Sequence, residues 1–422
     1  MRSFLRMRVK KRPPKAAGRE NVLFCIKIYF KELTLRFILF DTFVRVSMIL
    51  YISSAMQRGF QMPGIYTHNV IFKRALEAVA KKSGSSYIDK SVVSLFNSPE
   101  HKRAGLFGSI GPNIFDYMSI MYRGRSYGND IAYLLHNDEV SSFADNMLEI
   151  IKGYGDSRNE WASSQRAYLM GYISHIIADS VIHPFVFYFS GFPAGGTKKE
   201  AIHFRKLNLL FQYNIDNYFL YKDEGVENPG IDEMLPFYKI GRRSSLEPSV
   251  KALILQALKE LDEGLFSRAF KRIAGKKING ALGYVPGFDT IPSNIQLCYR
   301  IKRTENDRLK RYMDRVNDYP LFYSDFLVRY PGYKRVDMDA LNIHQGRWQY
   351  PAGQKGLRYE SVLHLIKTAV ERIVEAWERI ESISYGNKSI DIAPYIDINA
   401  YTGEKGVPFS EMKIKEVIKL RL

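Results

Sequence analysis

The most informative part of this sequence reads Gly171-Tyr-Ile-Ser-His-Ile-Ile-Ala-Asp-Ser-Val-Ile-His-Pro184. It lies in a mostly apolar segment, about residues 168–187, whose pattern predicts a buried helix. Residues four apart share one face of a helix, so His175, Asp179 and His183 form a single stripe. Histidine and carboxylate side chains are ligands that zinc takes in proteins. The segment therefore predicts a core helix that carries metal-competent side chains.

The spacing also bears on the number of ions. Eight residues of helix separate the outer histidines by roughly 12 Å along the axis, which is too far for one ion. If all three residues are ligands, they serve at least two ions, and the Asp179 carboxylate lies between them, as in two-metal hydrolytic sites. Pro184 disfavours further helix, so we expect His183 at the helix end.

The alternative is a buried helix whose polar side chains find ordinary hydrogen-bond partners. Burying two histidines and a carboxylate without partners is costly. Both interpretations stay open on spacing alone.

Composition narrows the class of protein. The 422 residues are 46% hydrophobic and 14% aromatic, which is typical of a globular protein rather than a disordered one. The net charge of +18 favours anionic partners such as nucleic acid or acidic phospholipid, although it also serves solubility. Cys25 and Cys298 are the two cysteines, so a cysteine-based zinc site is excluded and any zinc must use histidine and carboxylate ligands.

Residues 1–61 form a basic N-terminal extension, with thirteen Lys or Arg against three acids. Its apolar run 37–56 contains Asp41 and Arg45, so it is a poor membrane span. No small-residue cleavage site is clear. Three interpretations remain: a membrane-leaning amphipathic extension, a degenerate targeting segment, or sequence upstream of a true start at Met62, which we favour. Location is open between the cytoplasm and a membrane-associated state.

The rest of the chain is dominated by helical periodicity. Residues 62–383 predict one helical domain, followed by a C-terminal tail at 384–422. Residues 81–100 are interpreted as a polar connection. Helices are expected at 161–184, 199–222, 248–273, 295–316 and 358–383. The predicted fold class is all-α, a multi-helix bundle.

Further candidate ligands lie outside the central stretch. His68 precedes a predicted helix, Asp116 follows a glycine-rich run, and His136 stands before Asn137-Asp-Glu139, which resembles a helix start. His203 lies on the helix after the central one. Asn208, Gln212 and Asp216 form a polar stripe on that same helix.

These residues together resemble the bacterial zinc-dependent phospholipase C family, which includes clostridial alpha-toxin. The run Gly171–Pro184 carries most of the likeness, and Gly108-Ser-Ile-Gly-Pro-Asn-Ile-Phe-Asp116 and Tyr66-Thr-His68 precede it in the family's order. The likeness covers residues 62–220 well and 220–383 loosely. It implies a bundle of the phospholipase C and P1 nuclease type that holds one to three zinc ions between its helices.

The resemblance also implies roles. Asp116, His136, His175 and Asp179 would hold one ion, Asp179 would bridge to a second ion with His68, and His183 would hold the remaining ion. Asp116 resembles the family's proposed general base. The family supplies His-x3-Glu on the next helix. If His203 is the histidine of this motif, Leu207 stands where the glutamate is expected. The alternative alignment on Asp216 places Asn208 at the histidine position and Gln212 at the glutamate position.

The leading hypothesis is a zinc-dependent phosphodiester hydrolase that cleaves phospholipid to diacylglycerol and a phosphorylated head group through a zinc-activated water. One rival is a single-strand nuclease or other phosphodiesterase on the same scaffold, for which no aromatic and basic stripe is evident. The other rival is a catalytically decayed protein that binds a membrane or a partner. The expected partner is a phospholipid or membrane surface, with nucleic acid second, and no protein partner is identifiable.

Overall fold

The computed structural model describes residues 64–422, apart from 83–85, 120–126, 156–158, 194–196, 224–232, 234, 236, 241–242, 272–282, 286, 319–324, 333–334, 353–355 and 387–390. The basic extension 1–61 lies outside the described residues. The predictions about this extension and about a start at Met62 therefore stay predictions.

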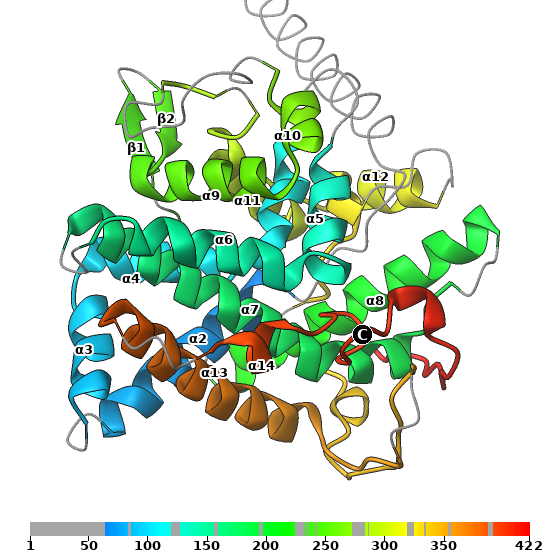
Figure 1. Ribbon diagram of the computed structural model, residues 1–422. Helices are drawn as coiled ribbons and strands as arrows, with labels where there is room; N and C mark the ends of the chain where they lie inside the picture. Colours follow the sequence, from blue (N-terminus) through cyan, green and yellow to red (C-terminus); the bar gives the residue numbers. More distant parts are fainter. Residues whose placement is uncertain are drawn as a thin grey trace, which may run out of the picture. The chain divides into compact units, whose positions relative to one another are not determined.

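The described chain is built almost entirely from helices, so the predicted all-α class is confirmed (Figure 1). In chain order these are α2 (Ile65–Lys82), α3 (Tyr87–Phe96), α4 (Pro99–Gly108), the 3-10 helix η1 (Gly111–Ser119), α5 (Gly128–Asn137), α6 (Val140–Lys152), α7 (Glu160–Ser190), α8 (Lys198–Tyr218), the π-helical turn η2 (Phe219–Asp223), α9 (Pro248–Leu261), α10 (Glu263–Ala269), α11 (Ile291–Lys302), α12 (Asp307–Asn317), the 3-10 helices η4 (Asp325–Leu327) and η5 (Asp339–Leu341), α13 (Val362–Ser384), α14 (Ala393–Ile396) and η6 (Phe409–Glu411). One hairpin of β1 (Phe237–Ile240) and β2 (Arg243–Leu246) pairs Phe237 with Leu246 and Ile240 with Arg243.

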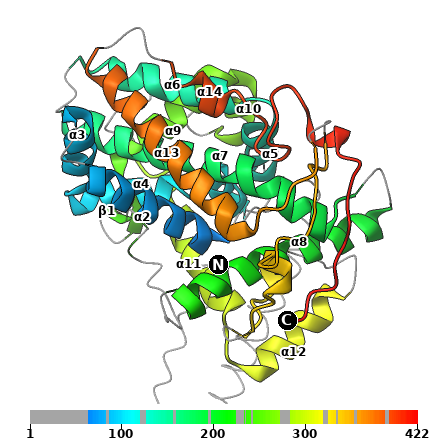
Figure 2. The ribbon, with the colours of Figure 1, turned by 90° about the horizontal axis from the view of Figure 1, so that it is seen from below.

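Helix α7 is the centre of the bundle. It packs against α4, α13, α6, α9, α8 and α2, and in Figures 1 and 2 these helices surround it. Nearly every side chain from Ala162 to Tyr188 is buried. By length and apolarity α7 could also cross a membrane, but its most apolar window is 100% buried inside the fold. Such burial is typical of the core helix of a globular domain.

Two glycines let α4 approach α7 closely. A Cβ on Gly171 would lie 2.0 Å from the carbonyl oxygen of Gly105, and a Cβ on Gly108 would lie 2.3 Å from the carbonyl oxygen of Tyr168. No side chain of any size fits between these backbones. The contact sets the position of Ser109, directly after α4.

The predicted end of the central helix at Pro184 is wrong. Helix α7 continues through Pro184 to Ser190, and His183 is fully buried. Proline lacks the N–H that would bond to the carbonyl of Ser180. Gly403 packs against this turn, since its Cβ would lie 2.3 Å from the Ser180 oxygen and 3.0 Å from the Pro184 ring. Tertiary packing around Pro184 therefore compensates for the missing backbone hydrogen bond.

Three other predicted segments differ. The connection expected at 81–100 contains α3 and the start of α4, because Ser86 and Ser98 cap these helices through their side chains. The helix expected at 248–273 divides at Asp262, whose carboxylate accepts a hydrogen bond from the Leu265 N–H at 2.8 Å. The helix expected at 295–316 divides before Asn306, which caps α12.

The C-terminal segment folds back onto the helices. Its Ile392, Tyr395, Ile396 and Ala400 belong to the main hydrophobic core. Backbone N–H groups of Glu416 and Ile418 donate to the carbonyls of Tyr188 and Phe189 at 2.8 Å and 2.9 Å. The segment therefore covers the end of α7.

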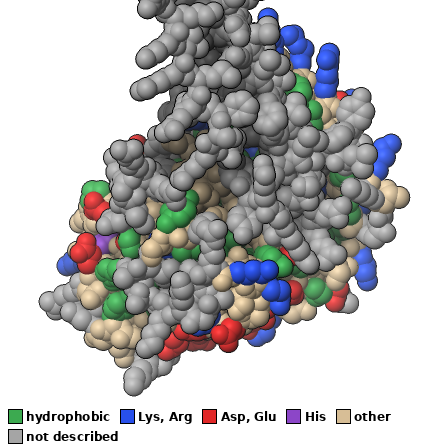
Figure 3. All heavy atoms as spheres, turned by 90° about the horizontal axis from the view of Figure 1, so that it is seen from above, with side chains coloured by type: hydrophobic (Ala, Val, Ile, Leu, Met, Phe, Trp, Pro, Cys, Tyr) green, Lys and Arg blue, Asp and Glu red, His purple; other side chains and the backbone are tan. Residues whose placement is uncertain are grey.

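The surface carries charges of both signs. Around the rim of the face in Figure 3, Lys and Arg side chains lie among Asp and Glu side chains of the described residues. This face does not by itself single out an anionic partner.

Candidate metal centre

Four imidazoles from three helices surround one carboxylate. The Nε2 atoms of His68 on α2 and His183 on α7 lie 3.2 Å and 3.0 Å from Oδ1 of Asp179. The Nε2 atoms of His175 on α7 and His136 on α5 lie 2.8 Å and 3.5 Å from Oδ2. All five side chains are at most 2% exposed. Each carboxylate oxygen thus faces two imidazole nitrogens.

Backbone carbonyls fix the orientation of two of these rings. His136 Nδ1 lies 2.6 Å from the Ala132 oxygen, and His175 Nδ1 lies 3.1 Å from the Ser109 oxygen. A carbonyl can only accept, so in both rings Nδ1 carries the hydrogen and a neutral ring presents the Nε2 lone pair. This outer hydrogen bond is the usual support of a metal-binding histidine.

Electrostatics keep these groups ready for a cation. Burial lowers the pKa of His136 and lowers that of His175 to about 4, so both rings are neutral near neutral pH. Burial would raise the pKa of Asp179, but the neighbouring imidazoles outweigh it and hold that pKa well below its usual value. The two Nε2 atoms of His136 and His175 are only 3.1 Å apart. Two lone pairs and a carboxylate at this separation repel unless a positive charge lies among them.

The donor set fits a divalent metal such as zinc. Tetrahedral ligands bound at 2.0–2.1 Å stand about 3.3 Å apart, and the Nε2–carboxylate distances here are 2.8–3.5 Å. Both ring nitrogens of His68 and His183 are buried without a hydrogen-bond partner. The His68 ring stacks on that of His175 with centroids 4.1 Å apart. Metal coordination would satisfy these atoms.

Local structure explains how His68 reaches the cluster. The start of α2 is held by Asp216 of α8, whose Oδ1 accepts hydrogen bonds from the Thr67 N–H at 2.8 Å and its hydroxyl at 2.5 Å. Tyr330 donates to the other oxygen at 2.7 Å. A Cβ on Gly64 would meet this carboxylate at 1.7 Å. Asp216 is the last member of the polar stripe on α8. Its carboxylate therefore caps the N-terminus of α2 and fixes the position of that helix.

Gly111 packs against the His175 ring of the cluster. Gly111 has a φ of +62°, and its Cβ would lie 2.2 Å from the His175 ring. The left-handed backbone and the ring together require glycine here. From this point η1 runs on to Asp116.

The C-terminal segment supplies a residue that the sequence did not reveal. The fully buried Tyr401 ring lies 5.4 Å from the His136 ring and 6.0 Å from the His183 ring, measured between centroids. The adjacent Ala400 N–H donates to the His136 carbonyl at 2.9 Å. A single tyrosine in a short tail carries no pattern that could have predicted this.

The remaining predicted ligands lie elsewhere. Asp116 is 4% exposed and lines a cavity whose lining includes none of the five residues of the cluster. Burial, followed by the nearby Asp325 carboxylate, raises the pKa of Asp116 to about 8. His203 is exposed on α8, against Phe204, and does not join the buried cluster. Asn208 and Gln212 are buried and hydrogen-bonded to each other.

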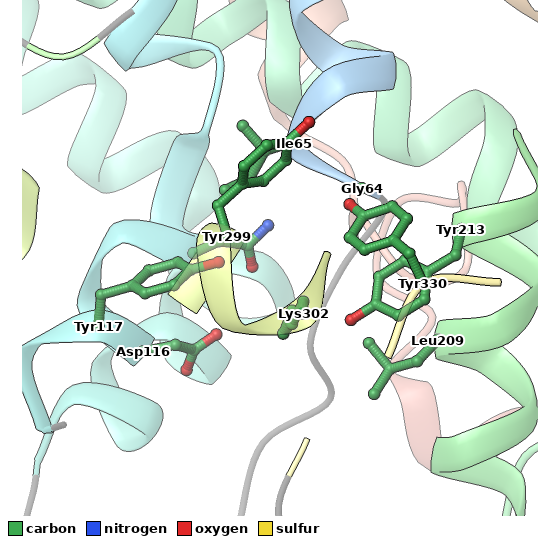
Figure 4. Close-up of a pocket in the computed structure, with 10 residues that line it drawn as sticks. Gly64, Ile65, Asp116, Tyr117, Leu209, Tyr213, Tyr299, Lys302 and Tyr330 are labelled. Carbon is green, nitrogen blue, oxygen red and sulfur yellow. The ribbon is translucent and has the colours of Figure 1, made fainter. Parts of the chain in front are cut away.

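The cavity beside Asp116 is lined from several segments (Figure 4). Asp116 and Tyr117 of η1 lie on one side, while Tyr213 of α8 and Tyr330 lie on the other. Lys302, the last residue of α11, also faces it. Polar and aromatic side chains thus border this cavity.

Comparison with known proteins supports the interpretation of this centre. Residues 67–229 match the family model described as zinc dependent phospholipase C. This match supports assigning the segment to the zinc-dependent phospholipase C family. No curated protein and no solved structure matches the sequence. The family is zinc-dependent, and the ligand atoms of His68, His175 and Asp179 lie within 4.8 Å of one another, so they could hold the ion.

Proposed function

We propose that this protein is a zinc-dependent phosphodiester hydrolase of the phospholipase C type, which cleaves phospholipid into diacylglycerol and a phosphorylated head group. The single observation that carries the proposal is the buried convergence of four imidazole Nε2 atoms on the two oxygens of Asp179. The family match supplies the class of reaction.

In this proposal some side chains bind the metal and another accepts a proton. His68, His136, His175 and His183 would hold zinc together with the Asp179 carboxylate that they face. When bound, zinc supplies Lewis-acid chemistry that polarises a phosphoryl oxygen and lowers the pKa of water. Asp116 would accept the proton of the attacking water in its ionised form, and its raised pKa, about 8, makes that form a stronger base than an ordinary carboxylate.

One observation favours a second candidate, a protein of this family that has lost part of its metal complement. Asn208 and Gln212 are neutral, and they bond to each other where a histidine and a glutamate would supply ligands by resemblance. A site that depends on them would hold its ion weakly. The cluster around Asp179 does not need them.

The test uses the full chain purified without chelator. Elemental analysis after dialysis counts zinc, and mass spectrometry follows diacylglycerol release from phosphatidylcholine vesicles, with single-stranded DNA as the rival substrate. We expect at least one zinc per chain and diacylglycerol release that His175→Ala abolishes. The exposed His203→Ala variant is the matched control.

The outcomes separate the candidates. If the chain binds zinc and cleaves DNA but not lipid, the protein is a nuclease and not a phospholipase. Zinc without turnover on either substrate would favour the decayed protein. A folded chain without zinc would refute the metal centre.

A further inference from the structure

Lys302 lies outside the segment, residues 67–229, that matches the family model. Its side chain is only 7% exposed, and it faces the cavity that Asp116 also lines (Figure 4). In the described part of the chain, no carboxylate oxygen lies within the 4.0 Å of an ion pair with its Nζ. Asp325, the nearby acid, pairs instead with Arg205 at 3.3 Å. Buried ammonium groups are ordinarily paired, so an unpaired one in a cavity needs an explanation.

The partners that Lys302 does have are aromatic faces. Its Nζ lies 5.4 Å from the centroid of Tyr213 and 5.6 Å from that of Phe326. These contacts stabilise a cation only partly and leave its N–H donors available.

The aromatic wall argues against a cationic ligand. Tyrosines around a cavity often bind quaternary ammonium groups. Here a cation of the chain itself already occupies two of the ring faces. The guanidinium of Arg303 lies 4.2 Å from the ring centroid of Tyr330 and 5.0 Å from that of Tyr299. A further cation would meet Lys302 and Arg303 as like charges, whereas an anion would be attracted to both.

The size of the cavity defines the ligand further. Its volume of about 30 Å³ holds about two or three water molecules, which is the size of one phosphate group. An open groove of about 470 Å³, lined by Lys310 and Arg335 among others, shares Tyr330 with the cavity. A small anion can occupy the cavity while the remainder of a larger molecule lies outside.

We propose that Lys302 is an anion-binding residue of this protein, and that the cavity between Lys302 and Asp116 receives the phosphate of a phosphate ester or free inorganic phosphate. The proposal rests on the proposed function for the identity of the ester, and it adds a specificity-determining residue from the part of the chain outside the family match. Lys302 donates to the phosphate oxygens, and the neighbouring tyrosines exclude bulk water.

The experiment is isothermal titration of the full chain, as purified, with inorganic phosphate and with dihexanoyl-phosphatidylcholine. Lys302→Met keeps the length of the side chain and removes the charge. We expect it to weaken phosphate binding at least about tenfold, equivalent to about 1.4 kcal/mol. Lys302→Arg should keep most of the affinity. The surface variant Lys152→Met is the matched control and should bind as wild type, because Lys152 pairs with Glu149 away from the cavity.

Several results would overturn the proposal. Phosphate binding that survives Lys302→Met but disappears in Asp179→Asn would place the anion at the histidine cluster instead. Binding of choline chloride in preference to phosphate would make the cavity a cation site. If Lys302→Met does not fold, Lys302→Gln provides the same comparison.

The remaining results distinguish this proposal from the proposed function. Lys302-dependent binding of either probe supports it, and the tighter probe shows whether a lipid head group or free phosphate is the ligand. Lys302-dependent binding without lipid turnover would refute the hydrolase and keep this site. Lipid turnover with Lys302-independent binding would refute this site alone.

Discussion

Replacing Gly171 by alanine should damage the bundle and the metal centre together. The added Cβ would lie 2.0 Å from the Gly105 carbonyl oxygen and 2.9 Å from the Gly108 Cα. Favourable heavy-atom contacts need about 3.5 Å, so α4 must retreat by roughly 1.5 Å. Both obstacles are backbone atoms, which cannot rotate away.

The magnitude follows from two opposing effects. Overpacking a core costs about 1–3 kcal/mol, and we expect the upper end because backbone must move. Alanine gains about 1 kcal/mol over glycine in a helix interior. The free energy of unfolding should therefore fall by about 2 kcal/mol or more.

The same movement reaches the metal centre. Ser109 directly follows α4, and its carbonyl oxygen lies 3.1 Å from His175 Nδ1. A retreat of α4 breaks this bond and frees the ring to rotate. We expect zinc content to fall along with stability.

Urea denaturation followed by circular dichroism measures the first effect, and elemental analysis measures the second. Gly332→Ala is the matched control, because its Cβ would meet only the Arg335 side chain, at an ordinary contact distance of 3.9 Å. That variant should be neutral or slightly stabilised. Wild-type stability and zinc content in Gly171→Ala would refute the close-contact reasoning.

Four other predictions concern the centre itself. Asp179→Asn should reduce zinc content to less than half of wild type, since all four imidazoles face the lost charge. His203→Ala should leave zinc content and turnover unchanged. Asp116→Asn should lower turnover by about 10²–10⁴-fold if it removes the general base, and a smaller loss would assign that role elsewhere. In the metal-free chain, His175 titrates near 6.5 when unfolded and about 4 when folded, so the unfolded state binds the proton first as pH falls. Stability should be fully present above pH 6.5 and decline toward pH 4, with a slope of up to about 1.4 kcal/mol per pH unit, and urea midpoints that stay constant over this range would contradict it.

Local sequence rules predicted the core of the fold but not its interruptions. An apolar segment with no charges between His175 and His183 other than Asp179 had to be a buried helix, and α7 is one. The rule for proline failed at Pro184, because it describes one lost hydrogen bond and takes no account of packing by Gly403. The break at Asp262 was missed because apolar periodicity continues across it, and only the capping bond marks it.

Some residues of the candidate site could likewise be predicted from local sequence, and others could not. Helical spacing placed His175, Asp179 and His183 on one face. His68 and His136 are separated from that helix by many residues, so family resemblance suggested them and tertiary packing brings them in. The sequence places Lys302 within the helix expected at 295–316 but does not predict its burial. Its burial depends on aromatic residues from α8 and η4 that spacing cannot reveal.

The Tyr401 ring against His136 and His183 has a consequence for how the protein is made. All four histidines have left the ribosome long before Tyr401, which follows His183 by 218 residues. At about 5–20 residues per second, that interval is roughly 10–40 s. During it the nascent chain has every histidine of the centre but no C-terminal segment above them. We therefore expect zinc to enter the growing chain readily, and to exchange much more slowly once synthesis is complete and the last segment has docked.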